Sequence, residues 1–179
     1  VVNPIFSASD VIVKLKNTVW DNGNAIFQPT SFQISNIHSG TGAKNIVPGE
    51  LDMLFNFRYS TESTHEKLMS EFESILKELN VEYEIDWKLS GLPYLTKEDN
   101  LKDVVVDSIE NITGYSPDLN AKGGTSDGRF IAKMGTEIVE LGPLNETIHQ
   151  IDEHVKISEI ELLQKIYTNI LNNLNQKLA

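Results

Sequence analysis

The stretch LDMLFNFRYSTESTHEKLMSEFESILKELNVEYEIDWKL, residues 51–89, decides the fold of the first half of this chain. Its first nine residues alternate between apolar and polar side chains, which is the pattern of a strand with one buried face. That face would carry Leu51, Met53, Phe55, Phe57 and Tyr59. A helical repeat follows, with Ser63 and Glu66 in the positions of a capping box, and residues 81–89 alternate again. We therefore predict a strand, a helix and a further strand.

The residues before this stretch add another helix and another strand. Asn3-Pro4 is typical of a helix start, because Asn caps the first turn and Pro fits into it. This helix is expected to end near Trp20, and residues 30–37 are expected to form a strand. The predicted order is α-β-β-α-β, which is a ferredoxin-like β-α-β-β-α-β unit that lacks its first strand.

The pattern changes after Pro93 to a helix, a short strand and a second helix. Thr96 and Asp99 are expected to cap the first of these helices, which ends at Gly114. Residues 136–141 read as a short buried strand. This alternation is typical of a layered α/β domain.

A long final helix is predicted to open with a second capping box, made by Ser158 and Glu161. The chain is thus predicted to contain two modules. The first, residues 1–93, is an α+β module with a ferredoxin-like fold, and the second, residues 94–179, is part of an α/β domain.

The composition excludes several classes of function. The chain has 179 residues and a net charge of −11, and it has no cluster of Lys or Arg, so no nucleic-acid partner is expected. It has no Cys, which removes disulfides and thiolate zinc sites. No apolar run approaches the length of a membrane span. Because the chain begins with Val just before a helix, we expect it to be a piece of a longer protein.

Residues 123–154 hold the groups best suited to chemistry. A glycine pair before Thr125 allows a ligand to approach the backbone, and a helix start after it favours an anion. No Lys follows these glycines, so a phosphate-binding loop is set aside. A Gly-Pro loop then leads to His149, and imidazole is the commonest protein ligand for metals.

Four motifs resemble the succinyl-diaminopimelate desuccinylases, which are zinc-dependent amide hydrolases of the aminoacylase and carboxypeptidase clan. They are GTGAKNIVPGEL at residues 40–51, FNFRYSTE at residues 55–62, GGTSDGRF at residues 123–130 and ELGPLNETIH at residues 140–149. The resemblance extends over nearly the whole chain. It implies hydrolysis of N-succinyl-L,L-diaminopimelate with two zinc ions, in the cytoplasm, on the path to lysine and cell-wall precursors.

The resemblance also implies roles for single residues. His149 matches a zinc ligand, and Gly124, Thr125 and Asn145 match the pocket for the succinyl carboxylate. Arg58 matches the residue that binds the amino-acid carboxylate of the substrate, and Asn45 matches a residue that reaches across a homodimer into the neighbouring active site. The first module would be the lid through which the homodimer forms.

The other zinc ligands and the general base of the family lie N-terminal to the part of the protein that this sequence matches. We therefore expect no catalytic residue in this chain and no turnover by the chain alone. Two alternatives stay open at this point. The longer protein could be an acetylornithine deacetylase-like metallohydrolase, and the isolated chain could be an inert dimerisation module.

Overall fold

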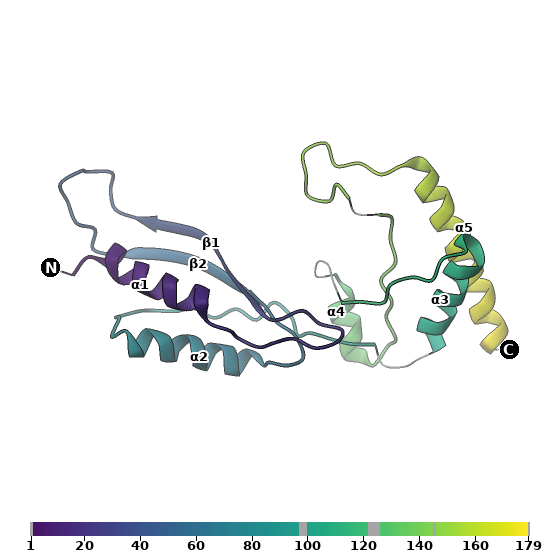
Figure 1. Cartoon of the computed structure of the whole chain (residues 1–179), viewed down its shortest axis with the longest axis horizontal. Helices are drawn as coiled ribbons and strands as arrows, with labels where there is room; N and C mark the ends of the chain where they lie inside the picture. Colours follow the sequence, from purple (N-terminus) through teal and green to yellow (C-terminus); the bar gives the residue numbers. More distant parts are fainter. Residues whose placement is uncertain (1, 97–99, 122–125, 145, 179) are drawn as a thin grey trace. The chain divides into compact units, whose positions relative to one another are not determined.

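The structure is a computed structural model, and it describes residues 2–96, 100–121, 126–144 and 146–178 (Figure 1). Its contacts divide the chain into two units. One unit comprises Val1–Pro93 and Asn120–Lys122, and the other comprises Tyr94–Leu119 and Gly123–Ala179. Each unit has its own hydrophobic core and is described by itself.

The first unit begins with helix α1, Pro4–Asn17. The Asn3 side chain accepts a hydrogen bond of 3.0 Å from the Ile5 backbone N–H, and Pro4 occupies the first turn, so the predicted start is confirmed. The helix ends at Asn17, before Trp20, because Thr18 already has an extended backbone. Val11 and Leu15 are its buried residues.

The loop after α1 is held by the Asp21 carboxylate. Its Oδ1 atom accepts hydrogen bonds of 2.9 Å from the backbone N–H groups of Gly23 and Thr30, and its Oδ2 atom accepts one from the Thr30 hydroxyl. Gly23 has φ +63°, and a Cβ there would lie 2.5 Å from the Phe27 carbonyl oxygen, so the turn requires glycine.

Strands β1, Ser31–Ser39, and β2, Leu51–Arg58, form an antiparallel hairpin. The register runs from Ser31 opposite Arg58 to Ser39 opposite Leu51, with an irregularity between Ile34 and Asn36. Exposure alternates along β2 residue by residue. The strand predicted for the start of the 51–89 stretch is therefore confirmed, and the one before it lies at almost the expected place.

Helix α2, His65–Glu78, packs against the hairpin and supplies the centre of the core. Its Phe72 side chain is 1% exposed and stacks on Phe55, with ring centroids 4.6 Å apart and ring planes 16° apart. Trp20, Phe32, Phe57 and Trp87 lie around these two rings. Aromatic contacts of this kind combine a large buried area with favourable ring geometry.

The predicted capping box of α2 is wrong by one residue. The cap is Thr64, whose hydroxyl accepts a hydrogen bond of 3.2 Å from the Lys67 N–H. Ser63 is instead buried beneath the helix start, and its hydroxyl has no hydrogen-bond partner in the described part of the chain. Glu66 lies in the first turn, where an acidic side chain complements the helix dipole.

Residues 81–89 differ from the prediction of a third strand. Their exposure alternates as expected, and Val81, Tyr83, Ile85 and Trp87 pack against the core. Among the described residues, however, only β1 and β2 form a ladder, and no backbone group of residues 82–90 bonds to another backbone group. The segment is extended without a partner, because alternation specifies a buried face but does not supply a neighbouring strand.

The second unit is built on helices α3, Asn100–Thr113, and α5, Ile157–Leu178. Val104 and Val105 of α3 and Ile166 and Ile170 of α5 form its core. The fully buried Ser108 hydroxyl of α3 accepts a hydrogen bond of 3.1 Å from the Asn173 amide of α5, which satisfies a polar group inside the contact. Between these helices the chain forms the short helix α4, Gly128–Ile131, and the 3-10 turn η1, Ala132–Met134.

The strand predicted at residues 136–141 is also absent from the described structure. Side chains fix this extended segment instead. Thr96 donates to the Ile138 carbonyl at 2.5 Å and accepts from the Ile138 N–H at 3.2 Å, and the Tyr167 hydroxyl donates to the Leu141 carbonyl at 2.6 Å. Whether Thr96 also caps α3 falls on residues 97–99, which lie outside the described residues.

The caps predicted for α5 and α3 have different outcomes. Helix α5 already begins at Ile157, so Ser158 lies inside its first turn and is not the residue before it. Asp99, the other residue expected to cap α3, lies outside the described residues. A Glu137 carboxylate oxygen accepts a hydrogen bond of 2.9 Å from the Leu101 N–H at the start of α3, and thus takes the role of a cap.

Candidate functional site

Arg58 and Asn45 lie at opposite ends of the β1–β2 hairpin. Arg58 is the last residue of β2 and is exposed, whereas Asn45 is an exposed residue of the turn that joins the two strands beyond the Ser39–Leu51 pair. Strand β2 alone spans roughly 23 Å, at about 3.3 Å per residue. The first unit therefore does not bring these two predicted site residues together.

Gly124, Thr125 and Asn145 lie outside the described residues, so the predicted carboxylate pocket is known here only through its neighbours. Helix α4, which follows the glycine turn, is four residues long, and its Asp127 cap makes no side-chain hydrogen bond. A single turn has little dipole. The expected contribution of a helix start to anion binding is therefore not supported, and recognition would rest on the side chains and backbone N–H groups of the turn itself.

A hydrogen-bonded cluster joins a residue that follows the predicted pocket residues 123–125 to one that precedes the predicted pocket residue Asn145. The Glu140 carboxylate accepts hydrogen bonds from the Tyr94 hydroxyl, at 2.5 Å, and from the Ser126 hydroxyl, which directly follows the glycine turn. Ser126 in turn accepts from the Gly128 N–H at 3.0 Å. A Cβ at Gly128 would lie 2.6 Å from the Tyr94 oxygen, so this approach requires glycine. Burial, together with the hydrogen bond to Glu140, raises the pKa of Tyr94.

The sequence alone indicated no special role for Tyr94, Ser126 or Glu140. The two glutamates around residues 136–141 were expected to flank a strand, and they instead bond to other segments of the second unit. A carboxylate that follows an apolar run looks like any exposed acid in a sequence, since its partners lie far away in the chain.

His149 lies on the exposed loop that follows the Gly-Pro turn, in a left-handed backbone conformation with φ +60°. Its imidazole makes no hydrogen bond within the described part of the chain, so its ring nitrogens are available to a ligand. Next to it in the loop, the Gln150 N–H donates a hydrogen bond of 3.0 Å to the Thr147 carbonyl. An accessible imidazole fits the role of one metal ligand.

The described residues do not by themselves form a metal site. Among them, no three His, Asp or Glu side chains are placed to hold one ion. His38 lies on β1, His65 is 3.0 Å from Glu66 at the start of α2, and the His154 ring bonds to the Asp152 carbonyl. Because catalytic zinc takes about three protein ligands, His149 could serve only as one ligand of a site completed elsewhere.

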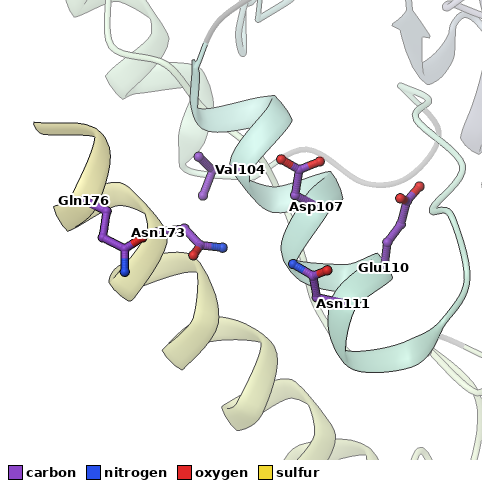
Figure 2. Close-up of a pocket in the computed structure, with 6 residues that line it drawn as sticks. All are labelled: Val104, Asp107, Glu110, Asn111, Asn173 and Gln176. Atoms are coloured by element: carbon purple, nitrogen blue, oxygen red, sulfur yellow. The ribbon is translucent and has the colours of Figure 1, made fainter.

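Figure 2 shows a hollow of a different kind, between α3 and α5. It is lined by Val104, Asp107, Glu110, Asn111, Asn173 and Gln176. None of the described residues singled out from the sequence lines this hollow. It is open to solvent, and two of its lining residues, Asp107 and Glu110, are acidic and would repel a carboxylate.

No helix in the described part of the chain has the length and apolar character needed to cross a membrane.

The comparisons with known proteins agree on one group of enzymes. Residues 1–84 match the family model of the peptidase dimerisation domain. The chain is 54% identical over 172 residues to the succinyl-diaminopimelate desuccinylase of Acinetobacter baumannii (strain AYE). The aligned region covers 96% of this chain and 46% of that protein. The chain thus spans about half the length of the curated relatives that it matches.

Two solved structures have the same fold. The M20 family metallo-carboxypeptidase Sso-CP2 from Sulfolobus solfataricus aligns with a TM-score of 0.75 and 16% identity, over 96% of this chain and 52% of that one. A tripeptidase from Staphylococcus aureus aligns with a TM-score of 0.71 and 26% identity, over 93% of this chain and 44% of that one. Residues 1–84 are thus similar to a peptidase dimerisation domain, and the chain as a whole is similar to the succinyl-diaminopimelate desuccinylases and has the fold of M20 peptidases.

Proposed function

We propose that this chain is the C-terminal part of a succinyl-diaminopimelate desuccinylase, a cytoplasmic enzyme that cleaves N-succinyl-L,L-diaminopimelate into succinate and L,L-diaminopimelate. Water adds its oxygen to the succinyl carbonyl carbon, and the released amine takes up a proton. The observation that carries the proposal is the 54% identity to a desuccinylase over 96% of the chain. The N-terminal half would supply the general base and the remaining metal ligands.

Two zinc ions would activate the attacking water in the complete enzyme. The part of this chain in that centre is the His149 imidazole, which is exposed, faces no competing hydrogen-bond partner among the described residues and lies on a loop. Its neutral form donates a nitrogen lone pair to the ion. Among the described residues, no three His, Asp or Glu side chains are placed to hold one ion, so the remaining ligands would come from elsewhere in the complete enzyme.

Two sets of residues would recognise the substrate. Gly124, Thr125 and Asn145 would donate hydrogen bonds to the succinyl carboxylate, because a backbone N–H, a hydroxyl and an amide are neutral donors suited to it. Arg58 would bind the amino-acid carboxylate at the other end of the substrate through its planar fork. Its exposure at the end of β2 leaves the guanidinium free for this contact.

A second copy of the chain would complete the site. Helix α1 has apolar residues on the face opposite Val11 and Leu15, where a surface helix normally carries polar groups; they include Phe6, 70% exposed, and Val13, 59% exposed. Such a stripe on a dimerisation domain is suited to a homodimer contact. Asn45, at the far end of the hairpin from Arg58, would then act in the active site of the neighbouring copy.

The activity is tested by joining residues 1–179 to the N-terminal half of the Acinetobacter baumannii desuccinylase. We expect the joined protein to release succinate from N-succinyl-L,L-diaminopimelate in the presence of zinc, and the 179-residue chain alone to release none. Substitution His149→Ala should abolish turnover of the joined protein. Turnover by the chain alone would contradict the proposal, because it would require a complete metal site within residues 1–179.

The same joined protein distinguishes the desuccinylase from an acetylornithine deacetylase-like enzyme. A pocket with Thr125 and Asn145 donors should favour the succinylated substrate, since its carboxylate would otherwise leave these donors without a partner. We expect Asn145→Leu to lower kcat/KM for the succinylated substrate by at least about tenfold. Faster hydrolysis of acetylornithine than of the succinylated substrate would favour the alternative enzyme.

A further inference from the structure

One side chain, that of Thr147, joins the two ends of the loop that carries His149. Every residue from 146 to 156 is exposed except Thr147, which is half-buried. Ile151 is 95% exposed, so the loop does not gain order by burying its own apolar groups. A loop without buried contacts depends on its hydrogen bonds for a defined shape.

The Thr147 hydroxyl makes two hydrogen bonds to the same residue seven positions later. It accepts from the His154 backbone N–H at 3.1 Å and donates to the His154 carbonyl at 2.9 Å. Both backbone groups of His154 are thereby satisfied by one hydroxyl, which is able to donate and accept at once. These bonds close residues 147–154 into a loop with its two ends in contact.

His149 and Asp152 lie inside this closed loop, and each has φ +60°. Residues other than glycine rarely adopt this left-handed conformation, and it persists only where the surrounding structure fixes it. Within the described part of the chain, the other loop bonds are local ones, such as Gln150 to Glu146 at 3.0 Å. The Thr147–His154 contact is therefore the one that spans the loop and encloses the His149 backbone.

We propose that Thr147 is a positioning residue, whose hydroxyl closes the 147–154 loop and so holds the His149 imidazole in its outward orientation for a metal ion. The role given to the imidazole rests on the proposed function, whereas the closure of the loop does not. Thr147 itself would contact neither the metal ion nor the substrate. Its effect passes entirely through the backbone of the loop.

The test compares two substitutions at Thr147, one that removes the hydroxyl and one that keeps it. Thr147→Val keeps the shape of the side chain and removes the hydrogen bonds, while Thr147→Ser keeps the hydroxyl. Thr168→Val is the matched control, because the Thr168 hydroxyl only bonds to the Gln164 carbonyl within α5. The measurements are amide exchange at His154 in the 179-residue chain, and zinc affinity of the joined protein by competition with a chelator.

We expect Thr147→Val to speed His154 amide exchange by about tenfold and to weaken zinc binding by a similar factor. Thr147→Ser should restore both, and Thr168→Val should change neither. Unchanged exchange in Thr147→Val would overturn the closure of the loop. Faster exchange with unchanged zinc affinity would overturn the positioning role. If His149→Ala leaves zinc affinity intact, the proposed ligand is wrong, and the exchange data still decide whether Thr147 closes the loop.

Discussion

At the scale of single residues, Asp21 holds the loop after α1 through three hydrogen bonds. Burial disfavours its charged form, but the hydrogen bonds from the Thr30 side chain, the Thr30 N–H and the Gly23 N–H outweigh this effect and lower the pKa of Asp21. Ionised Asp21 therefore stabilises the folded state above the ordinary carboxyl pKa, and this contribution is lost as the pH falls through the lowered value.

We expect Asp21→Asn to destabilise the first unit by about 1–3 kcal/mol at pH 7, because the Thr30 hydroxyl loses its acceptor. The variant should also lose less stability than the parent chain as the pH falls below 4. Both effects are measured by urea unfolding, followed by the fluorescence of Trp20 and Trp87, which lie in this unit. Asp10→Asn is the control, since Asp10 is an exposed residue of α1. An equal loss of stability in both variants would contradict the role of the loop.

Single residues also show where sequence reasoning reaches its limit. Asn3-Pro4 was recognised as a helix start because the cap and its target lie two residues apart. The hydrogen bonds of Glu140 and Thr147 were not predicted, because their partners lie farther away in the sequence. The partners of Glu140 are 14 and 46 residues away, and the partner of Thr147 is seven residues away. His149 was singled out by its place after the Gly-Pro loop and assigned to zinc by resemblance, but nothing in its neighbours predicted its left-handed backbone.

At the scale of elements, α2 and the hairpin share one aromatic core with Phe72 at its centre. We expect Phe72→Ala to destabilise the first unit by about 3–5 kcal/mol, because the remaining rings cannot collapse to fill the space. Ser74→Ala, on the exposed side of the same helix, should change stability by less than about 0.5 kcal/mol. Urea unfolding gives both values, and a loss below about 1 kcal/mol for Phe72→Ala would show that the core is loosely packed.

Periodicity predicted elements better than it predicted their partners. It located all three long helices of residues 65–178 and both strands of the hairpin, because a buried face leaves a repeat in the sequence. It also marked residues 81–89 and 136–141 as strands, and both are extended. A ladder needs a second strand at the right distance, and no local pattern contains that information. Cap positions shifted by a residue because Ser63 and Thr64 are equally able to cap.

At the scale of the whole molecule, the first unit should set the oligomeric state. We expect the chain to be a dimer, and the double substitution Phe6→Asp with Val13→Asp to raise its dissociation constant at least about a hundredfold, since two charges would be buried in an apolar contact. Analytical ultracentrifugation measures this constant. Ser74→Asp on α2 is the control and should leave it unchanged. A parent chain that stays monomeric at high concentration would refute the dimer contact through α1.

Two modules with a boundary near Pro93 were predicted from the change of pattern; the contacts of the structure form two units, the first of which also includes Asn120–Lys122. What no sequence pattern could supply is the convergence of groups from distant segments. Arg58 pairs with Ser31 at one end of the hairpin, whereas Asn45 lies six residues beyond Ser39 of the pair at the other end, and only the pairing reveals that they are far apart. The same applies to Tyr94 and Ser126, which meet on Glu140.

The extended segment at residues 81–89 has a consequence for the handling of this protein. Glu82, Glu84 and Asp86 point to solvent from a backbone with no ladder partner among the described residues, while the residues between them anchor it to the core. Endoproteases bind their substrates as extended strands by backbone pairing, so an enzyme that cuts after acidic residues should be able to nick the chain here. A further strand docked along this segment would block that cut, and resistance to digestion would then report that the sheet had been completed.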